Sequence, residues 1–275
     1  MPLERRRYGD GGFRCGVSRL SESSAPESPP SPRQIHAVIR KEGEEQLERH
    51  GGAIAWSGLA AGLSMGFSFL TMALIQGRMP DEQWTPLVTS LGYTLGFLIV
   101  ILGRQQLFTE TTLTPVLPIL TDFSMARVGK LFRFWGIVLS ANLVGTWLFA
   151  WGISHEDFFI PTVWQSLESI AVGAVQEPFW PMVFKSVLAG WLIALMVWVL
   201  PSSGPAKIWI IVVITYTVAM GHFSHAIAGS CEAAFAVITG TKGLYDYFFV
   251  FLIPTVLGNT VGGVTLVAML NHAPL

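Results

Sequence analysis

Two hydrophobic stretches of this chain, residues 86–119 and 207–239, are too long for one membrane crossing and contain polar residues near their middle. The polar interruptions are Gly103-Arg104-Gln105-Gln106 and Gly221-His222-Phe223-Ser224-His225. A helix needs only about 20 residues to cross the hydrocarbon core of a bilayer. Non-helical backbone and ionisable side chains at that depth are tolerated only inside protein or along a cavity. Two interrupted spans in matching positions therefore predict a transport pathway.

The composition supports lipid as the solvent for most of the chain. Hydrophobic residues make up 51% of the sequence and charged residues only 13%, whereas a soluble domain normally carries about 25% charge. The two cysteines are Cys15, in a polar segment, and Cys231, in a hydrophobic span. This placement gives no reason to expect a structural disulfide.

The chain is predicted to have three parts. Residues 1–34 are rich in Arg, Ser, Pro and Glu, and we expect a disordered cytoplasmic tail. Residues 35–50 combine apolar and charged positions in the manner of an interfacial amphipathic helix. Residues 51–275 form the six-span transport domain. Acidic residues are interspersed with the basic run Arg5-Arg6-Arg7, so no nucleic-acid partner is expected.

Six apolar segments are expected to contact membrane lipid: 52–76, 86–119, 131–154, 180–200, 207–239 and 246–270. Positive charge is concentrated on alternate connections, at Arg40, Lys41, Arg49, Arg127, Lys130, Arg133 and Lys207. Cytoplasmic loops carry an excess of Lys and Arg. The pattern therefore predicts that both termini lie in the cytoplasm, which agrees with an even number of spans. The connection 155–179, which combines aromatic and acidic residues, suits a helix lying at the outer interface.

An internal repeat relates the two halves of the chain. The third segment contains Ala141-Asn142-Leu143-Val144-Gly145, and the sixth contains Gly258-Asn259-Thr260-Val261-Gly262. The two polar breaks are separated by nearly the same distance in sequence as the two asparagines. Because each half has three spans, the halves must be inverted. We therefore predict an all-α membrane protein of six transmembrane helices in two inverted repeats of three, with broken second and fifth helices.

Four motifs, in order along the chain, resemble those of the formate/nitrite transporter family. They are Leu107-Phe108-Thr109 after the first break, Ala141-Asn142-Leu143-Val144-Gly145, Phe223-Ser224-His225-Ala226-Ile227-Ala228, and Ile253-Pro254-Thr255-Val256-Leu257-Gly258-Asn259-Thr260-Val261-Gly262-Gly263. The resemblance covers residues 52–270 and implies a divergent member of that family.

The resemblance implies an aquaporin-like arrangement and a homopentamer with one pore in each protomer, in the bacterial inner (cytoplasmic) membrane. The substrates it implies are small monovalent anions such as formate or nitrite, or their conjugate acids. Leu107, Phe108 and Thr109 would form a loop that narrows the pore. His225 would be the central histidine, with Thr109 and Asn259 as its polar neighbours.

The chemistry of these residues suits such a pore. A histidine in a membrane span is a functional candidate, because few ionisable groups are tolerated there. Moving an anion between apolar side chains costs much free energy, whereas moving its neutral conjugate acid costs far less. The hypothesis is that an anion enters a vestibule, is protonated there or at His225, and passes as the neutral acid. Phe108 and Phe223 are candidate apolar gates on either side of His225.

Several positions depart from the family pattern. Ser224 stands where the family has glutamate, Gly229 where it has asparagine, and Gly190 where asparagine is frequent. These changes alter the expected surroundings of the histidine and leave the substrate open. Arg104 is expected to attract anions or to pair with Glu110. The alternatives considered for the two acids of the apolar segments, Glu110 and Glu232, are lining a vestibule or pairing with Arg104 or Lys185.

Two alternative functions stay open. One is a pore of the same fold for small neutral solutes, which the loss of polar groups around His225 favours. The other is a non-transporting membrane scaffold whose tail binds a partner. No enzyme, cofactor or metal is expected, since the chain has no nucleophile–base set or phosphate loop, and His222, His225 and Cys231 lack a standard ligand spacing.

Overall fold

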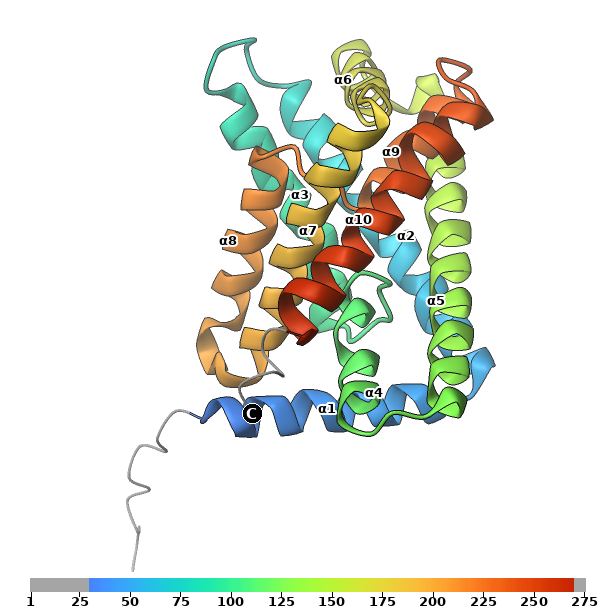
Figure 1. Ribbon diagram of the computed structural model, residues 1–275. Coiled ribbons are helices and arrows are strands. Elements are labelled where there is room, and N and C mark those ends of the chain that lie inside the picture. The colour runs from blue at the N-terminus through green and yellow to red at the C-terminus, as the bar shows by residue number, and fades with distance from the viewer. Residues whose placement is uncertain (1–29, 270–275) are drawn as a thin grey trace, which may run out of the picture.

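The computed structural model describes residues 30–269 of the chain, and every regular element in this range is helical. Four helices are long and apolar enough to cross a membrane: α2 (Gly51–Gln76), α3 (Thr85–Leu102), α5 (Met125–Gly152) and the helix formed by α7 (Phe179–Val199) with the turn that follows it. The predicted all-α class is confirmed. The helices pack side by side in a bundle (Figure 1).

The other apolar segments are divided into shorter helices. Segment 86–119 contains α3, two short 3₁₀ turns, η1 (Glu110–Thr112) and η2 (Thr114–Val116), and then α4 (Leu117–Thr121). Segment 207–239 contains α8 (Lys207–Met220) and α9 (Ala228–Ile238), separated by the irregular residues 221–227. The last segment contains α10 (Ile253–Gly263) between two π-helical turns, η6 (Asp246–Leu252) and η7 (Val264–Met269).

Two helices lie across the ends of the bundle. At one end α1 (Pro32–Glu48) runs roughly perpendicular to the long helices, and at the opposite end lies α6 (Pro161–Gly173) (Figure 1). We call these the α1 end and the α6 end. Ser31 and Gln34 form a capping box, and Pro32 stands in the first turn, so α1 begins inside the segment predicted to be disordered. Residues 1–29 of that segment lie outside the described residues.

Helix α1 is held against the segment that follows the first break. A Cβ atom on Gly43 would lie 2.0 Å from the backbone oxygen of Thr114, so only glycine permits this approach. The Thr114 hydroxyl donates to Gln46 Oε1 at 2.6 Å, and the side chain of Ile39 is fully buried. The backbone of α1 therefore contacts η2 directly, next to the broken helix.

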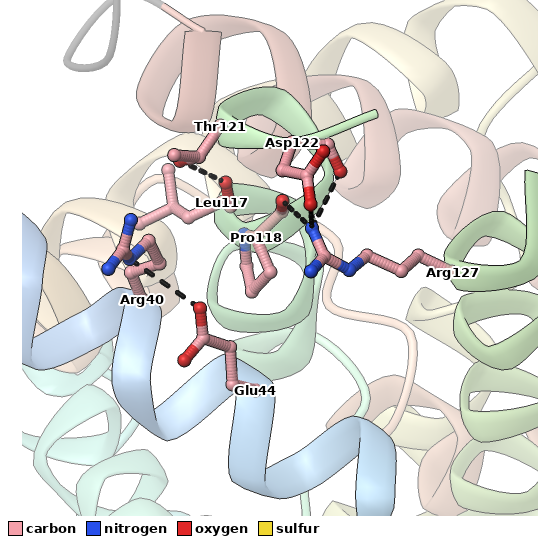
Figure 2. A network of polar contacts seen from close by, with 7 residues as sticks. All are labelled: Arg40, Glu44, Leu117, Pro118, Thr121, Asp122 and Arg127. Atoms are coloured by element: carbon pink, nitrogen blue, oxygen red, sulfur yellow. Dashed lines mark hydrogen bonds and ion pairs between the residues drawn. The ribbon is translucent and has the colours of Figure 1, made fainter. Parts of the chain in front are cut away.

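A polar network fixes the connection from α4 to α5 at the α1 end (Figure 2). Arg127 donates to the backbone oxygens of Asp122 at 2.7 Å and of Pro118 at 3.3 Å, and it pairs with the Asp122 carboxylate at 2.7 Å. On α1, Arg40 and Glu44 form a separate ion pair at 3.6 Å. Exposed pairs of this kind contribute about 0–1 kcal/mol to stability. The main effect of the Arg127 contacts is to orient the chain as it leaves α4.

Candidate functional site

The first break begins where α3 ends. Gly103 caps the helix, and Arg104 has a positive φ of 50°. The next amide, that of Gln105, turns back to donate to the backbone oxygen of Val100 at 3.0 Å. A left-handed residue after a helix ends it without leaving the last carbonyl groups unsatisfied. The chain then enters the protein, where Leu107 and Phe108 are buried.

The second break repeats this conformation. Gly221 caps α8, and His222 has a positive φ of 49°. The amide of Phe223 donates to the backbone oxygen of Val218 at 3.0 Å. The two breaks therefore share the same sequence of helix end, left-handed residue and returning amide.

One asparagine holds each break in place. Asn142 on α5 accepts from the amide of Phe108 at 2.9 Å and donates to the backbone oxygens of Gln106 at 2.9 Å and Gly58 at 2.7 Å. Because such a side-chain amide satisfies both a donor and an acceptor of irregular backbone, it replaces the bonds that a helix would provide.

Asn259 on α10 does the same for the second break. It accepts from the amide of Ala226 at 2.8 Å and donates to the backbone oxygens of Ser224 at 3.0 Å and Ser186 at 2.7 Å. We call Asn142 and Asn259 the asparagine clamps. The sequence predicts Asn259 as a polar neighbour of His225, whereas its side chain binds the backbone around that histidine.

Two close helix contacts support the clamps. A Cβ atom on Gly62 of α2 would lie 2.2 Å from the backbone oxygen of Asn142, and one on Gly190 of α7 would lie 2.3 Å from that of Asn259. Glycine at these positions brings α2 against α5 and α7 against α10. The absence of a side chain at Gly190, a departure from the family pattern, is thus explained by packing against the second clamp.

The two breaks meet at Thr109 and His225. The Thr109 hydroxyl and His225 Nε2 are 2.5 Å apart, and both side chains are buried. His225 Nδ1 accepts from the amides of Ala228 at 3.1 Å and Ile227 at 3.3 Å. An imidazole nitrogen that accepts hydrogen bonds carries no proton, so the network assigns the proton of the neutral ring to Nε2, which faces Thr109.

Aromatic and aliphatic side chains surround this contact. The ring of Phe97 lies edge-on to the His225 ring, with centroids 5.0 Å apart, and Phe108 lies edge-on to Trp135 at 6.1 Å. Leu107 is fully buried and Phe223 is half-buried. Of the two histidines in the second break, His225 is buried and His222 is exposed, so only His225 has the surroundings expected of a central histidine.

The ion pairs that the sequence analysis considered for Glu110 and Glu232 are not formed in the part of the chain that the structure describes. Arg104 is exposed, and Lys185 pairs with Glu177. Among the described residues neither Glu110 nor Glu232 forms an ion pair. The acid near Arg104 is Glu42 of α1. Burial raises the pKa of the Glu42 carboxyl, while Arg104 opposes this shift. Sequence reasoning missed Glu42, whose position depends on the docking of α1.

The other two departures from the family pattern lie in the second break and just after it. Ser224 is half-buried, and its backbone oxygen accepts from Asn259. Gly229 stands in the first turn of α9, where a Cβ atom would lie 2.7 Å from the Phe251 ring. Packing space therefore accounts for glycine at position 229.

Comparison with known proteins agrees with this geometry. The family model described as formate/nitrite transporter matches residues 33–273. The inner membrane protein YfdC of Escherichia coli is 40% identical over 241 residues, which cover 88% of this chain and 78% of YfdC. The formate channel FocA of Haemophilus influenzae is 25% identical over 250 residues, covering 75% of this chain and 81% of FocA.

A solved pentameric formate channel with formate bound has the same fold. The TM-score is 0.66 at 20% sequence identity, and the match covers 86% of this chain and 98% of that channel. Proteins of this family are channels and transporters rather than enzymes, in agreement with the sequence prediction. Because the family model matches well over half of this chain, the chain belongs to the formate/nitrite transporter family.

Proposed function

We propose that this protein is a channel or transporter that passes small monovalent anions, such as formate or nitrite, or their conjugate acids. The observation that carries the proposal is the contact between Thr109 and His225, which joins the two breaks at 2.5 Å inside the bundle. Leu107, Phe108 and Phe223 would form the apolar constrictions on the path. Between these constrictions a substrate would meet the Thr109 hydroxyl and the His225 imidazole.

The hydrogen bonds of His225 suggest how these groups act. With Nδ1 occupied by two amides, the Nε2 proton is donated to Thr109. The Thr109 hydroxyl then keeps its own hydrogen free to donate to a substrate oxygen. A second proton on Nδ1 would face two N–H donors at the start of α9, which disfavours the imidazolium. We therefore assign His225 the role of a neutral hydrogen-bond donor.

The architecture we propose is six spans in two inverted repeats of three. The repeated backbone turns at Gly103 and Gly221 and the paired asparagine clamps support it. We also propose a homopentamer in the bacterial inner membrane, by analogy with relatives that are named as a pentameric channel and an inner membrane protein. The basic residues near the α1 end support a cytoplasmic location for that end and for both termini.

Replacing His225 with alanine is expected to reduce formate and nitrite uptake by proteoliposomes about tenfold or more. The reason is the loss of a buried hydrogen bond, which with its unsatisfied partners is worth about 1–3 kcal/mol. Uptake by wild type and variant is measured by stopped flow at two external pH values, beside a small neutral solute. The control is His222→Asn, because His222 is exposed in the same break and asparagine tolerates its positive φ.

The same measurement tests the alternative of a neutral-solute pore. The apolar surroundings of His225 favour that alternative. Uptake of the neutral solute alone, unchanged by His225→Ala, would refute the anion function and leave the fold assignment intact.

A further inference from the structure

Each broken segment contains a buried run that is interrupted at one position by a partly exposed residue, and in both cases this residue is a glutamate. From residue 106 to residue 119 every residue is buried except Glu110. From residue 225 to residue 236 every residue is buried except Glu232. Along each segment the glutamate is therefore the one residue of the run that is not fully enclosed by the protein.

The two carboxyl groups lie on opposite sides of the central contact. Glu110 directly follows Thr109 and interacts electrostatically with Glu42 of α1 and with Lys207 at the start of α8. Glu232 lies on α9, which begins three residues after His225 and packs against α6; it interacts with Tyr93 of α3 and with Cys231 of α9. Figure 1 shows α6 at the end of the bundle opposite α1. One carboxyl group thus faces each end of the pore.

Among the described residues, no ion pair neutralises either carboxyl group. The ion pairs of this part of the chain do not include Glu110 or Glu232, although Lys207 lies within electrostatic range of Glu110. The Oε1 atom of Glu110 is buried and has no hydrogen-bond partner among the described residues. Burying an unpaired carboxylate is costly, and the cost is relieved when the group takes up a proton. An unpaired carboxyl group that water can reach is therefore suited to exchange a proton with that water or with a substrate.

We propose that Glu110 and Glu232 are the proton-exchanging groups of the two vestibules, an inference that rests on the proposed function. On the entry side the carboxyl O–H bond breaks, and its proton forms the O–H bond of the weak acid. The neutral acid crosses the constriction, and the carboxylate on the far side takes the proton from it. Each glutamate then exchanges a proton with water on its own side, so that one anion and one proton cross together.

This assignment explains how a weak-acid anion can be protonated near His225 although the histidine does not supply the proton. His225 Nδ1 is occupied by two amides, while its Nε2 hydrogen is directed at Thr109. An ionised glutamate also repels an anion at close range. Entry of a weak-acid anion should therefore require the protonated glutamate on the same side, and uptake should fall as pH rises on that side.

The test uses sealed membrane vesicles of both orientations and labelled formate. Glu110→Gln should lower uptake about tenfold or more, as expected for loss of a general acid or base, and should abolish its dependence on pH at the α1 end. Glu232→Gln should have the same effect on the pH dependence at the α6 end. The matched control is Glu82→Gln, because Glu82 is an exposed acid near the start of α3, and it should leave both dependences unchanged.

An infrared titration of the wild-type protein gives a second readout that does not depend on transport. The difference spectrum between wild type and each variant should show one carboxyl band that responds to pH and that the variant lacks. If wild type carries neither formate nor nitrite, the proposed function fails and this inference falls with it. If wild type carries them while both variants keep its pH dependence, or lose uptake equally at every pH and from both sides, only the assignment of the glutamates is overturned.

Discussion

Replacing Asn142 with alanine is expected to destabilise the protein by about 2–6 kcal/mol and to abolish uptake. The change leaves the amide of Phe108 and the backbone oxygen of Gln106 buried without their partner. Each unsatisfied buried group costs about 1–3 kcal/mol. The Gly58 oxygen also loses a bond, although it lies within the helix α2. Thermal unfolding in detergent and formate uptake by proteoliposomes measure the two effects.

The control for this prediction lies in the same loop. The side-chain oxygen of Gln105 has no hydrogen-bond partner among the described residues, so Gln105→Ala should change stability by only a few tenths of a kcal/mol. Asn259→Ala should behave like Asn142→Ala, because it holds the second break through the same three kinds of bond. A variant lacking Asn142 that melted and conducted like wild type would show that the loop is held by other contacts.

The position of the breaks was predictable from the sequence because helix termination is a local property. Gly103 and Gly221, each followed by polar residues, end their helices where expected. The connection between the third and fourth segments was also expected to hold a helix at one end of the bundle, and α6 occupies it. Local backbone preferences and the length of the apolar segments were enough to predict where these helices end and that a helix lies in this connection.

The contacts of the clamps were not predictable in the same way. Asn142 and Asn259 are recognisable as a repeated motif, but the groups that their side chains bind among the described residues are backbone groups, which any residue provides. The acid near Arg104 was missed for a related reason. Glu42 is far from Arg104 along the chain, and it approaches only because Gly43 allows α1 to pack against η2. Long-range packing of this kind leaves no local pattern in the sequence.

Replacing Gly190 with alanine is expected to destabilise the protein by about 1–3 kcal/mol or more, the cost of overpacking a close contact. The new Cβ atom would lie 2.3 Å from the backbone oxygen of Asn259 and 2.6 Å from its Cα atom. Backbone atoms cannot rotate away as a flexible side chain does, so α7 and α10 must separate. Because Asn259 moves with α10, its bonds to Ser224 and Ala226 should weaken, and uptake should fall with stability.

A second glycine distinguishes this steric effect from a general response to alanine. Gly129 lies in α5 with no atom within 4 Å of the Cβ position, so Gly129→Ala should be neutral or should stabilise the protein by up to about 1 kcal/mol through helix propensity. Gly190→Asn, which restores the residue frequent in the family, should be at least as harmful as Gly190→Ala because its side chain is larger. Unfolding temperatures of the three variants, measured in one detergent, test the explanation. If Gly190→Asn were as stable as wild type, α7 and α10 could separate without loss, and close packing against the second clamp would not be the reason for glycine here.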